Sequence, residues 1–445
     1  MTEQQNRMEE ARRESLSMMS FIGNSPTSFH AIRQIGDELL QGGMRELEMG
    51  ETWDIEPGGK YFTTYNSTSL VAFHLGTGDL RKEGFRMVAS HSDSPTFRLK
   101  PNGVSLANGQ MARLATETYG GAILYSWMDR PLSLAGRVLL RNASAPMHPA
   151  ERLLDFGRPI GVIPSVAIHF NRGVNEGAHF NKQVDMQMVC GSTDGFGEDA
   201  LRENIATQLG VTPADILDFD LYAYDTTPGH IAGFDSTLVV CPKQDNLAMA
   251  YASLKAFREA VESEPTTSKM LIVLDNEEVG SGTKQGAASP LVKNVVTRIC
   301  SKLNMGVEDT QRAIYNSFLV SADMAHAVHP NHPELADPNN LPALNGGPVI
   351  KYNASQKYMT DADGAAVFMS ACEIAGVPCQ TFVNRSDIAG GSTLGNIMTG
   401  QLPLRGVDVG NPLLAMHSCR ETGGVLDTLY MRKALTAFYS MKAAK

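Results

Sequence analysis

The sequence predicts an α/β domain that is interrupted by a β-rich insertion. Residues 1–100 alternate between helix-like and strand-like runs, and this alternation returns from residue 234 to residue 445. Between them, residues 101–233 consist mainly of short β-like runs separated by Gly, Pro and Asn turns. The length of 445 residues exceeds the usual limit of a single hydrophobic core, so two domains are expected.

The first part of the α/β domain opens with two predicted helices. Residues 3–19 are helix-like, and Ser25 followed by Pro26 predicts an N-cap with proline at the first helical position. The pair Gly42-Gly43 predicts where this second helix ends. Three strand-like runs follow, at residues 60–65, 69–75 and 85–89.

The insertion and the second part of the α/β domain have different patterns. In the insertion, residues 122–127 and 136–141 read as strands, and residues 198–209 read as a helix. After the insertion, amphipathic segments predict helices at residues 246–263, 361–375 and 425–443. Apolar runs predict strands at residues 236–241, 270–274 and 317–321.

Composition excludes several classes of partner. The formal net charge of −10 and the pI near 5.6 argue against a nucleic-acid or anionic-membrane partner. No apolar run approaches the length of a membrane span, and the charged amino-terminal segment does not resemble a signal peptide. The six cysteines are scattered without a Cys-x-x-Cys pair. A cytoplasmic, reducing location is therefore expected.

Potential metal ligands follow three of the predicted strands. The strand at residues 85–89 leads to His91, the strand at residues 317–321 leads to Asp323, and the strand at residues 270–274 leads to Glu277 and Glu278. In open α/β sheets the functional crevice lies beyond the carboxyl ends of the strands. Any one of these residues could simply be a turn or capping residue, but three together favour a shared site.

The two adjacent glutamates suit a hydrolytic metal site. Gly280 lets the chain leave the sheet, so both carboxylates can face one cavity. One glutamate can then bind a metal ion while the other takes a proton from water. Asp93, two residues after His91, can hold the second ring nitrogen of that histidine. Alone, however, a Glu-Glu pair is typical of an exposed loop.

Asp245 and His417 complete a possible set of ligands for two metal ions. Asp245 follows an apolar run and begins a helix, where the helix dipole favours a carboxylate. By itself it would be read as an N-cap. His417 lies among apolar residues, where a lone histidine is more often a core residue.

Six ordered motifs resemble those of the aspartyl aminopeptidase family, which includes vacuolar aminopeptidase I, and the resemblance runs nearly end to end. The motifs are Phe21-Ile22-x-x-Ser25-Pro26-x-x-Phe29-His30, His91-Ser92-Asp93-Ser94-Pro95, Asp245-Asn246-Leu247, Asp275-Asn276-Glu277-Glu278-Val279-Gly280-Ser281, Ser321-Ala322-Asp323-Met324-Ala325-His326-x-x-His329-Pro330-Asn331, and Met416-His417-Ser418-x-Arg420-Glu421.

The resemblance implies a mixed-sheet dizinc exopeptidase domain, formed by residues 1–100 and 234–445, and a β-rich dimerisation domain at residues 101–233. It implies two Zn²⁺ ions per subunit, with Co²⁺ or Mn²⁺ as possible substitutes. Dimers would assemble into a tetrahedral dodecamer. The substrates would be peptides with a free amino terminus.

The resemblance also assigns roles to residues of the site. Asp245 would bridge both metals, with Glu278 and His417 completing one coordination sphere and His91 and Asp323 the other. Glu277 would remain unligated as the general base, and Asp93 would orient His91.

Further residues would serve the substrate. Lys351, Tyr358 and His326 would line its pocket, and the lysine predicts a preference for amino-terminal Asp or Glu unless it is a solvated surface residue. His169 would reach into the active site of a neighbouring subunit.

The sequence departs from the family pattern at Lys243 and Gln244, where an arginine and an apolar residue usually precede the bridging aspartate, and at Ser92, where threonine is more usual. The Gly-rich run at residues 389–395 could present backbone donors to the substrate or could be an ordinary helix start.

Other functions remain open at this point. The same chemistry could prefer neutral, leucine-like residues. A dimetal carboxypeptidase or deacylase could use similar ligands but would need a cationic clamp for a terminal carboxylate. A catalytically silent oligomeric scaffold would be expected to have lost Glu277 or a ligand, and none is lost here.

Overall fold

The computed structural model describes residues 2–107, 109–194, 196–197 and 199–442. Within them the strands form three sheets, and the largest has nine strands. In spatial order these are β1 (Arg45–Glu46), β2 (Lys60–Tyr65), β3 (Ser69–His74), β13 (Ser268–Leu274), β4 (Phe85–His91), β14 (Phe318–Ala322), β18 (Arg405–Gly410), β16 (Val349–Tyr352) and β17 (Gln380–Val383).

The centre of this sheet is parallel and is buried on both faces. Strands β13, β4, β14 and β18 run parallel to one another, whereas β3 pairs antiparallel with β13 and β16 antiparallel with β18. Val88 of β4 packs into one hydrophobic core, and its neighbours Met87 and Ala89 pack into the other. Because alternate side chains point to opposite faces, a strand between two helical layers is apolar over most of its length.

Helices cover both faces of the nine-stranded sheet. The first core includes residues of α1 (Glu3–Gly23), α2 (Ser28–Gln41), α5 (Gln244–Ser263), α8 (Ala362–Ala375) and α10 (Val425–Ser440). The second core includes residues of α3 (Leu80–Glu83), α6 (Leu291–Lys302), α7 (Val307–Tyr315) and α9 (Leu394–Thr399). The short helices are η1 (Leu124–Trp127), η2 (Val174–Glu176), η3 (Pro213–Asp215), η4 (Glu277–Val279) and η5 (Pro333–Leu335).

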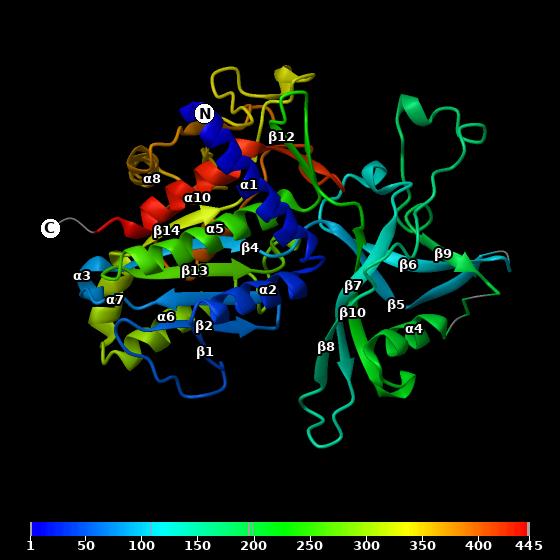
Figure 1. Ribbon diagram of the computed structural model, residues 1–445, viewed down its shortest axis with the longest axis horizontal. Coiled ribbons are helices and arrows are strands. Elements are labelled where there is room, and N and C mark those ends of the chain that lie inside the picture. The colour runs from blue at the N-terminus through cyan, green and yellow to red at the C-terminus, as the bar shows by residue number, and fades with distance from the viewer. Residues whose placement is uncertain (1, 108, 195, 198, 443–445) are drawn as a thin grey trace.

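A six-stranded antiparallel sheet forms a separate lobe, on the right in Figure 1. Its strands, in spatial order, are β8 (Ala150–Asp155), β7 (Leu132–Leu140), β10 (Ile216–Asp225), β5 (Thr96–Ala107), β6 (Met111–Tyr119) and β9 (Met188–Ser192). Helix α4 (Ala200–Leu209) packs on this lobe, which has its own apolar core. A role for this lobe in dimerisation stays a prediction.

A small five-stranded sheet brings distant segments of the chain together. Its strands are β11 (His230–Ala232), β12 (Leu238–Cys241), β20 (Glu421–Gly424), β19 (Pro412–Leu414) and β15 (Ala325–His326). The candidate residue Asp323 lies just before β15, Asp245 lies just after β12, and His417 lies between β19 and β20. This sheet therefore gathers three of the predicted ligands.

Most predicted elements are present, but two predictions were wrong. Residues 122–127 do not form a strand: η1 occupies Leu124–Trp127, because the Ser126 hydroxyl donates to Ile123 O (2.6 Å) and closes a turn. Ser25 does not cap α2, whose N-cap position is Thr27; the Ser25 hydroxyl instead donates to Gln34 Oε1 (3.1 Å). The predicted limits at residues 198 and 443 lie outside the described residues.

None of the described helices is long and apolar enough to cross a membrane.

Candidate metal centre

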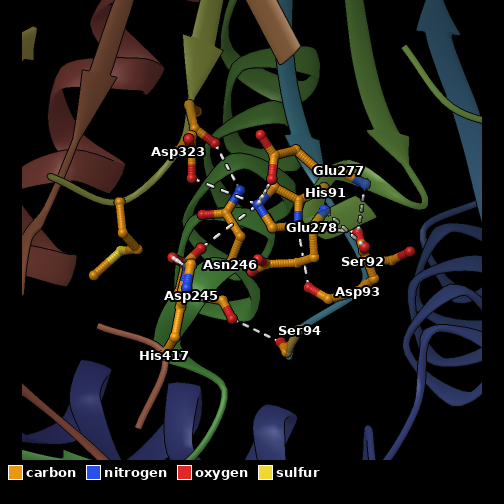
Figure 2. Close-up of polar contacts among 12 residues, drawn as sticks. His91, Ser92, Asp93, Ser94, Asp245, Asn246, Glu277, Glu278, Asp323 and His417 are labelled. Atoms are coloured by element: carbon orange, nitrogen blue, oxygen red, sulfur yellow. Dashed lines mark hydrogen bonds and ion pairs between the residues drawn. The ribbon is translucent and has the colours of Figure 1, made fainter. Parts of the chain in front are cut away.

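The five predicted ligands lie together at the carboxyl ends of the central strands. His91 is the last residue of β4, Glu278 lies in η4 directly after β13, and Asp323 follows β14. Asp245 lies at the start of α5, where its own backbone is not helical, and His417 lies in a loop with φ of 67°. Figure 2 shows these side chains pointing toward one another.

Asp245 occupies the centre of the cluster. Its Oδ1 lies 3.5 Å from His91 Nε2, and its Oδ2 lies 3.4 Å from His417 Nε2. His91 Nε2 is also 3.5 Å from Asp323 Oδ1, and His417 Nε2 is 3.5 Å from Glu278 Oε2. The two oxygens of Asp245 thus face two different histidines, each with its own second carboxylate. The cluster has two halves that share one residue.

The cluster is suited to cations. Three overlapping groups offer ligand atoms within 4.8 Å of one another: His91 with Glu277 and Glu278, His91 with Asp245 and Asp323, and Asp245 with Glu278 and His417. Asp245 Oδ1 and Glu278 Oε1 are buried without a hydrogen-bond partner. Buried charged oxygens without partners are costly, and a metal ion would relieve that cost. The residues present therefore fit a metal centre.

The pKa shifts reflect this crowding of carboxylates. Burial, together with the charges of Asp323, Asp93 and Asp245, raises the pKa of Glu277 to about 8, although His91 opposes the shift. Burial and the charge of Asp245 likewise raise the pKa of Glu278 well above its usual range. Negative charge repels further ionisation in a buried site, so the cluster attracts positive charge.

Between the histidines and the carboxylates, opposite charges shift pKa values toward the ionised forms. Burial works against a charged His91, but the adjacent carboxylates of Asp245, Asp323 and Asp93 raise its pKa well above the usual value. Burial also works against an ionised Asp245, yet the adjacent His417 and His91 imidazoles hold its pKa below the usual range. These groups stabilise one another's charges across the centre of the cluster.

Asp93 holds three parts of the site at once. Its Oδ1 is 3.2 Å from His91 Nδ1 and accepts from the Glu277 backbone N–H (3.2 Å). Its Oδ2 accepts from the Glu278 backbone N–H (3.1 Å) and from the Tyr119 hydroxyl (2.7 Å). A carboxylate with two oxygens can accept all four. Asp93 therefore contacts the imidazole and the backbone of both glutamates, and its role in orienting His91 stays a prediction.

Glu421 is a second buried carboxylate behind the site. Its Oε2 accepts from the Asp245 backbone N–H (3.0 Å) and its Oε1 from the His417 backbone N–H (3.1 Å). It therefore ties two ligands that are far apart in the sequence. Glu421 ended the last of the six motifs, but sequence reasoning gave it no role, because nothing in the sequence pairs it with residue 245.

Lys351 is neither solvated nor free. Its side chain is 2% exposed, and its ammonium donates to Asp323 O (2.8 Å), Asp323 Oδ2 (3.3 Å) and Met324 O (3.1 Å). A lysine has three N–H donors, and all three are used. The ammonium also lies 5.2 Å from the centre of the Tyr358 ring. Lys351 is thus a partner of Asp323, which the sequence did not indicate.

The other predicted substrate residues lie near Lys351. Tyr358 is buried, and the ring of His326 packs against Phe382 with 5.6 Å between centroids.

Asp408 accepts from the Met359 backbone N–H (2.6 Å) and from the Thr393 hydroxyl (2.6 Å), joining the loop after Tyr358 to the Gly-rich run.

The Gly-rich run leads into a helix start. Thr393 is the N-cap residue of α9. Backbone donation to a substrate from this run stays a prediction.

His169 lies apart from this cluster. It is an exposed residue in the long segment between β8 and β9, which projects from the six-stranded lobe (Figure 1). The structure contains one chain, so a contact with a neighbouring subunit stays a prediction.

The chain belongs to the M18 peptidase family. The family model described as aminopeptidase I zinc metalloprotease (M18) matches residues 21–439. A probable M18 family aminopeptidase 2 from Clostridium acetobutylicum is 44% identical over 426 residues, covering 95% of this chain and 98% of the relative. A protein of the same description from Pseudomonas aeruginosa is 40% identical over 428 residues, covering 95% and 97%. The protein is thus a metallo-aminopeptidase.

Solved structures share the fold. The chain resembles Ape4 in a cryo-EM structure of the Ape4 and Nbr1 complex, with a TM-score of 0.93, 33% identity and coverage of 97% of this chain and 86% of that chain. It also resembles mApe1 in a dodecamer from S. cerevisiae, with a TM-score of 0.84, 27% identity and coverage of 96% of both chains. The mixed α/β architecture is therefore that of M18 aminopeptidases.

Proposed function

We propose that the protein releases amino-terminal residues from peptides with the help of two divalent cations, preferably Zn²⁺. His91 and Asp323 would hold one cation, Glu278 and His417 the other, and Asp245 would serve both. The observation that supports this most directly is that Asp245 presents Oδ1 to His91 and Oδ2 to His417. Zinc is preferred because the family model describes zinc enzymes.

When bound, such cations lower the pKa of water from about 15.7 to about 7 and polarise the scissile carbonyl. Glu277 would act as the general base. Its Oε2 lies 3.9 Å from His91 Nε2, at the edge of the ligand cluster, and 14% of its side chain is exposed. It would take a proton from water and deliver it to the leaving nitrogen. Asp93 supports this role because it holds the Glu277 backbone in place.

The preference for acidic residues depends on Lys351. A substrate carboxylate would have to share an ammonium that already has three acceptors in Asp323 and Met324. We therefore propose a graded preference for Asp and Glu over Leu, with Tyr358 and His326 lining the same pocket. An exclusive preference would require a cation with free donors.

Self-association is part of the proposal. The related mApe1 was solved as a dodecamer, and exposed apolar side chains lie in the same segment as His169: Val166 (56% exposed), Ile168 (48%) and Phe170 (87%). Apolar residues clustered on a surface favour a protein interface. We propose that this chain forms dimers through the six-stranded lobe, that the dimers form a dodecamer, and that His169 enters a neighbour's site.

A cytoplasmic location is proposed from the cysteines. All six are free thiols, as expected for a protein in a reducing compartment.

One assay tests both the metal dependence and the specificity. The protein is given Glu-, Asp- and Leu-anilides and the N-acetyl form of Glu-anilide, before and after treatment with a chelator. Hydrolysis of the free-amine substrates should be lost on chelation and restored by Zn²⁺, and the N-acetyl form should be resistant. Equal hydrolysis of the N-acetyl form would contradict aminopeptidase action.

The same panel with Lys351→Met tests the pocket. The Glu-to-Leu ratio of kcat/KM should fall several-fold, because a nearby positive charge is removed. An unchanged ratio would show that Lys351 serves only Asp323.

A further inference from the structure

A segment of the insertion runs along the candidate metal centre. Residues 119–126, here called the insertion strap, run from the last residue of β6 into η1. The strap starts within the six-stranded sheet, where Tyr119 pairs with Thr96 of β5, and the Tyr119 ring packs edge-on against Tyr222 of β10 at 5.8 Å between centroids. Its first residue is therefore held firmly by the insertion lobe.

The first end of the strap contacts the glutamate loop. The Tyr119 hydroxyl donates to Asp93 Oδ2 (2.7 Å) and accepts from Asn276 Nδ2 (2.8 Å). Asn276 in turn accepts from Thr283 and Gln285 through its Oδ1, both at 2.8 Å. Asp93 is the carboxylate that binds the backbone N–H groups of both glutamates and faces His91. Tyr119 thus supports the group on which that half of the site depends.

The glycines of the strap allow it to pass close to the ligands. A Cβ at Gly120 would lie 3.1 Å from Glu278 Cβ, and Gly120 has φ of 73°. A Cβ at Gly121 would lie 3.4 Å from His417 Nδ1. A side chain at Gly120 would be strained and would press on Glu278.

The far end of the strap binds the His417 loop. The Ile123 backbone N–H donates to His417 O (3.0 Å), and Ser126 Oγ accepts from the Cys419 backbone N–H (2.8 Å). These contacts matter because the loop is irregular and His417 has a positive φ. One short segment of the insertion therefore touches both halves of the cluster.

We propose that the insertion strap positions the metal centre and that Tyr119 is a positioning residue for it. This inference rests on the proposed function. The strap couples the insertion lobe to the ligands: Tyr119 holds Asp93, and thereby His91 and both glutamates, while Ile123 and Ser126 hold the His417 loop. Hydrogen-bond partners behind metal ligands fix their orientation and raise metal affinity.

The test is Tyr119→Phe, which removes one hydroxyl and keeps the ring. Zn²⁺ affinity is measured by competition with a chromophoric chelator, and kcat and KM are measured at fixed free Zn²⁺. Affinity and kcat should each fall about tenfold, within the usual range for partners behind ligands. KM should change less than about twofold, because Tyr119 does not touch the substrate in this proposal.

Tyr224→Phe is the matched control. The Tyr224 hydroxyl donates to Asp155 Oδ1 (2.6 Å), so this variant also loses a tyrosine–carboxylate bond in the insertion lobe but leaves the strap intact. It should retain wild-type Zn²⁺ affinity. An equal loss in both variants would show general loosening and would overturn the proposal, as would wild-type affinity in Tyr119→Phe.

Ser126→Ala keeps the test decisive if Tyr119→Phe does not fold. It removes the acceptor for Cys419 and should weaken Zn²⁺ binding about tenfold, at the lower end of such effects. Unchanged affinity would then overturn the proposal. Failure of the proposed function would look different, because the wild-type protein itself would then bind no Zn²⁺ in competition with the chelator.

Discussion

The two halves of the candidate metal centre are built differently. His91 ends a strand that is buried on both faces, and its side chain is only 1% exposed. His417 lies in a loop, its side chain is 30% exposed, and its backbone has a positive φ. Asp245 is shared by both. The comparison indicates that a strand of the sheet itself carries His91, whereas His417 depends on contacts of its loop with Glu421 and with the far end of the insertion strap.

The largest effect is expected from Glu277, which the proposed function leaves without a cation. Glu277→Gln keeps the size of the side chain but removes the base, so kcat should fall by about 10²–10⁴-fold, the usual contribution of general acid–base catalysis. Zn²⁺ content, measured by atomic emission after gel filtration, should stay at the wild-type level. Near-normal turnover would reject the assignment of Glu277.

Replacing each histidine by alanine should show a difference in metal content between the two halves. His417→Ala should lose about one of the two proposed cations and keep the other, since the His91 half has buried partners of its own. His91→Ala should lose metal more completely, because His91 faces Asp245, Asp323 and Asp93. Metal stoichiometry per chain measures both. Equal stoichiometry in the two variants would show that the halves are equivalent.

A smaller effect is expected from Glu421→Gln. A glutamine has one acceptor oxygen, so one of the backbone N–H groups of Asp245 and His417 would lose its partner, which costs about 1–3 kcal/mol where that group is buried. Chemical denaturation of the metal-free protein should show this loss of unfolding free energy. Zn²⁺ binding should weaken more in the His417 half, where Glu421 holds both His417 and Asp245, than in the His91 half, where it holds Asp245 alone. Equal weakening of both halves would contradict the comparison.

Much of the site could be predicted because its ligands follow apolar strands. Strand ends are local features, and parallel strands place their carboxyl ends at one edge of the sheet, so His91, Glu278 and Asp323 could be grouped from the sequence. Asp245 and His417 could be predicted as ligands only through the resemblance to known proteases. Their local sequences are equally typical of an N-cap and a core histidine.

The supporting residues could not be predicted in the same way. Tyr119 meets Asp93, and Glu421 meets Asp245, only through tertiary packing, and no local pattern marks such pairs. The failed strand at residues 122–127 has the same origin: Ile123 donates to His417 O rather than to a neighbouring strand. Ser25 was misplaced as a cap because several residues near it could serve as one.

The environment of Lys351 has a consequence for its reactivity. An amine reacts with acylating or carbamylating reagents through a free lone pair, but this ammonium is 2% exposed and has all three hydrogens engaged. The neighbouring Asp323 also raises the pKa of Lys351 despite its burial. Surface lysines would be labelled long before Lys351. The slow rate of labelling at Lys351 would report how often the segment around Asp323, between β14 and β15, moves away from it.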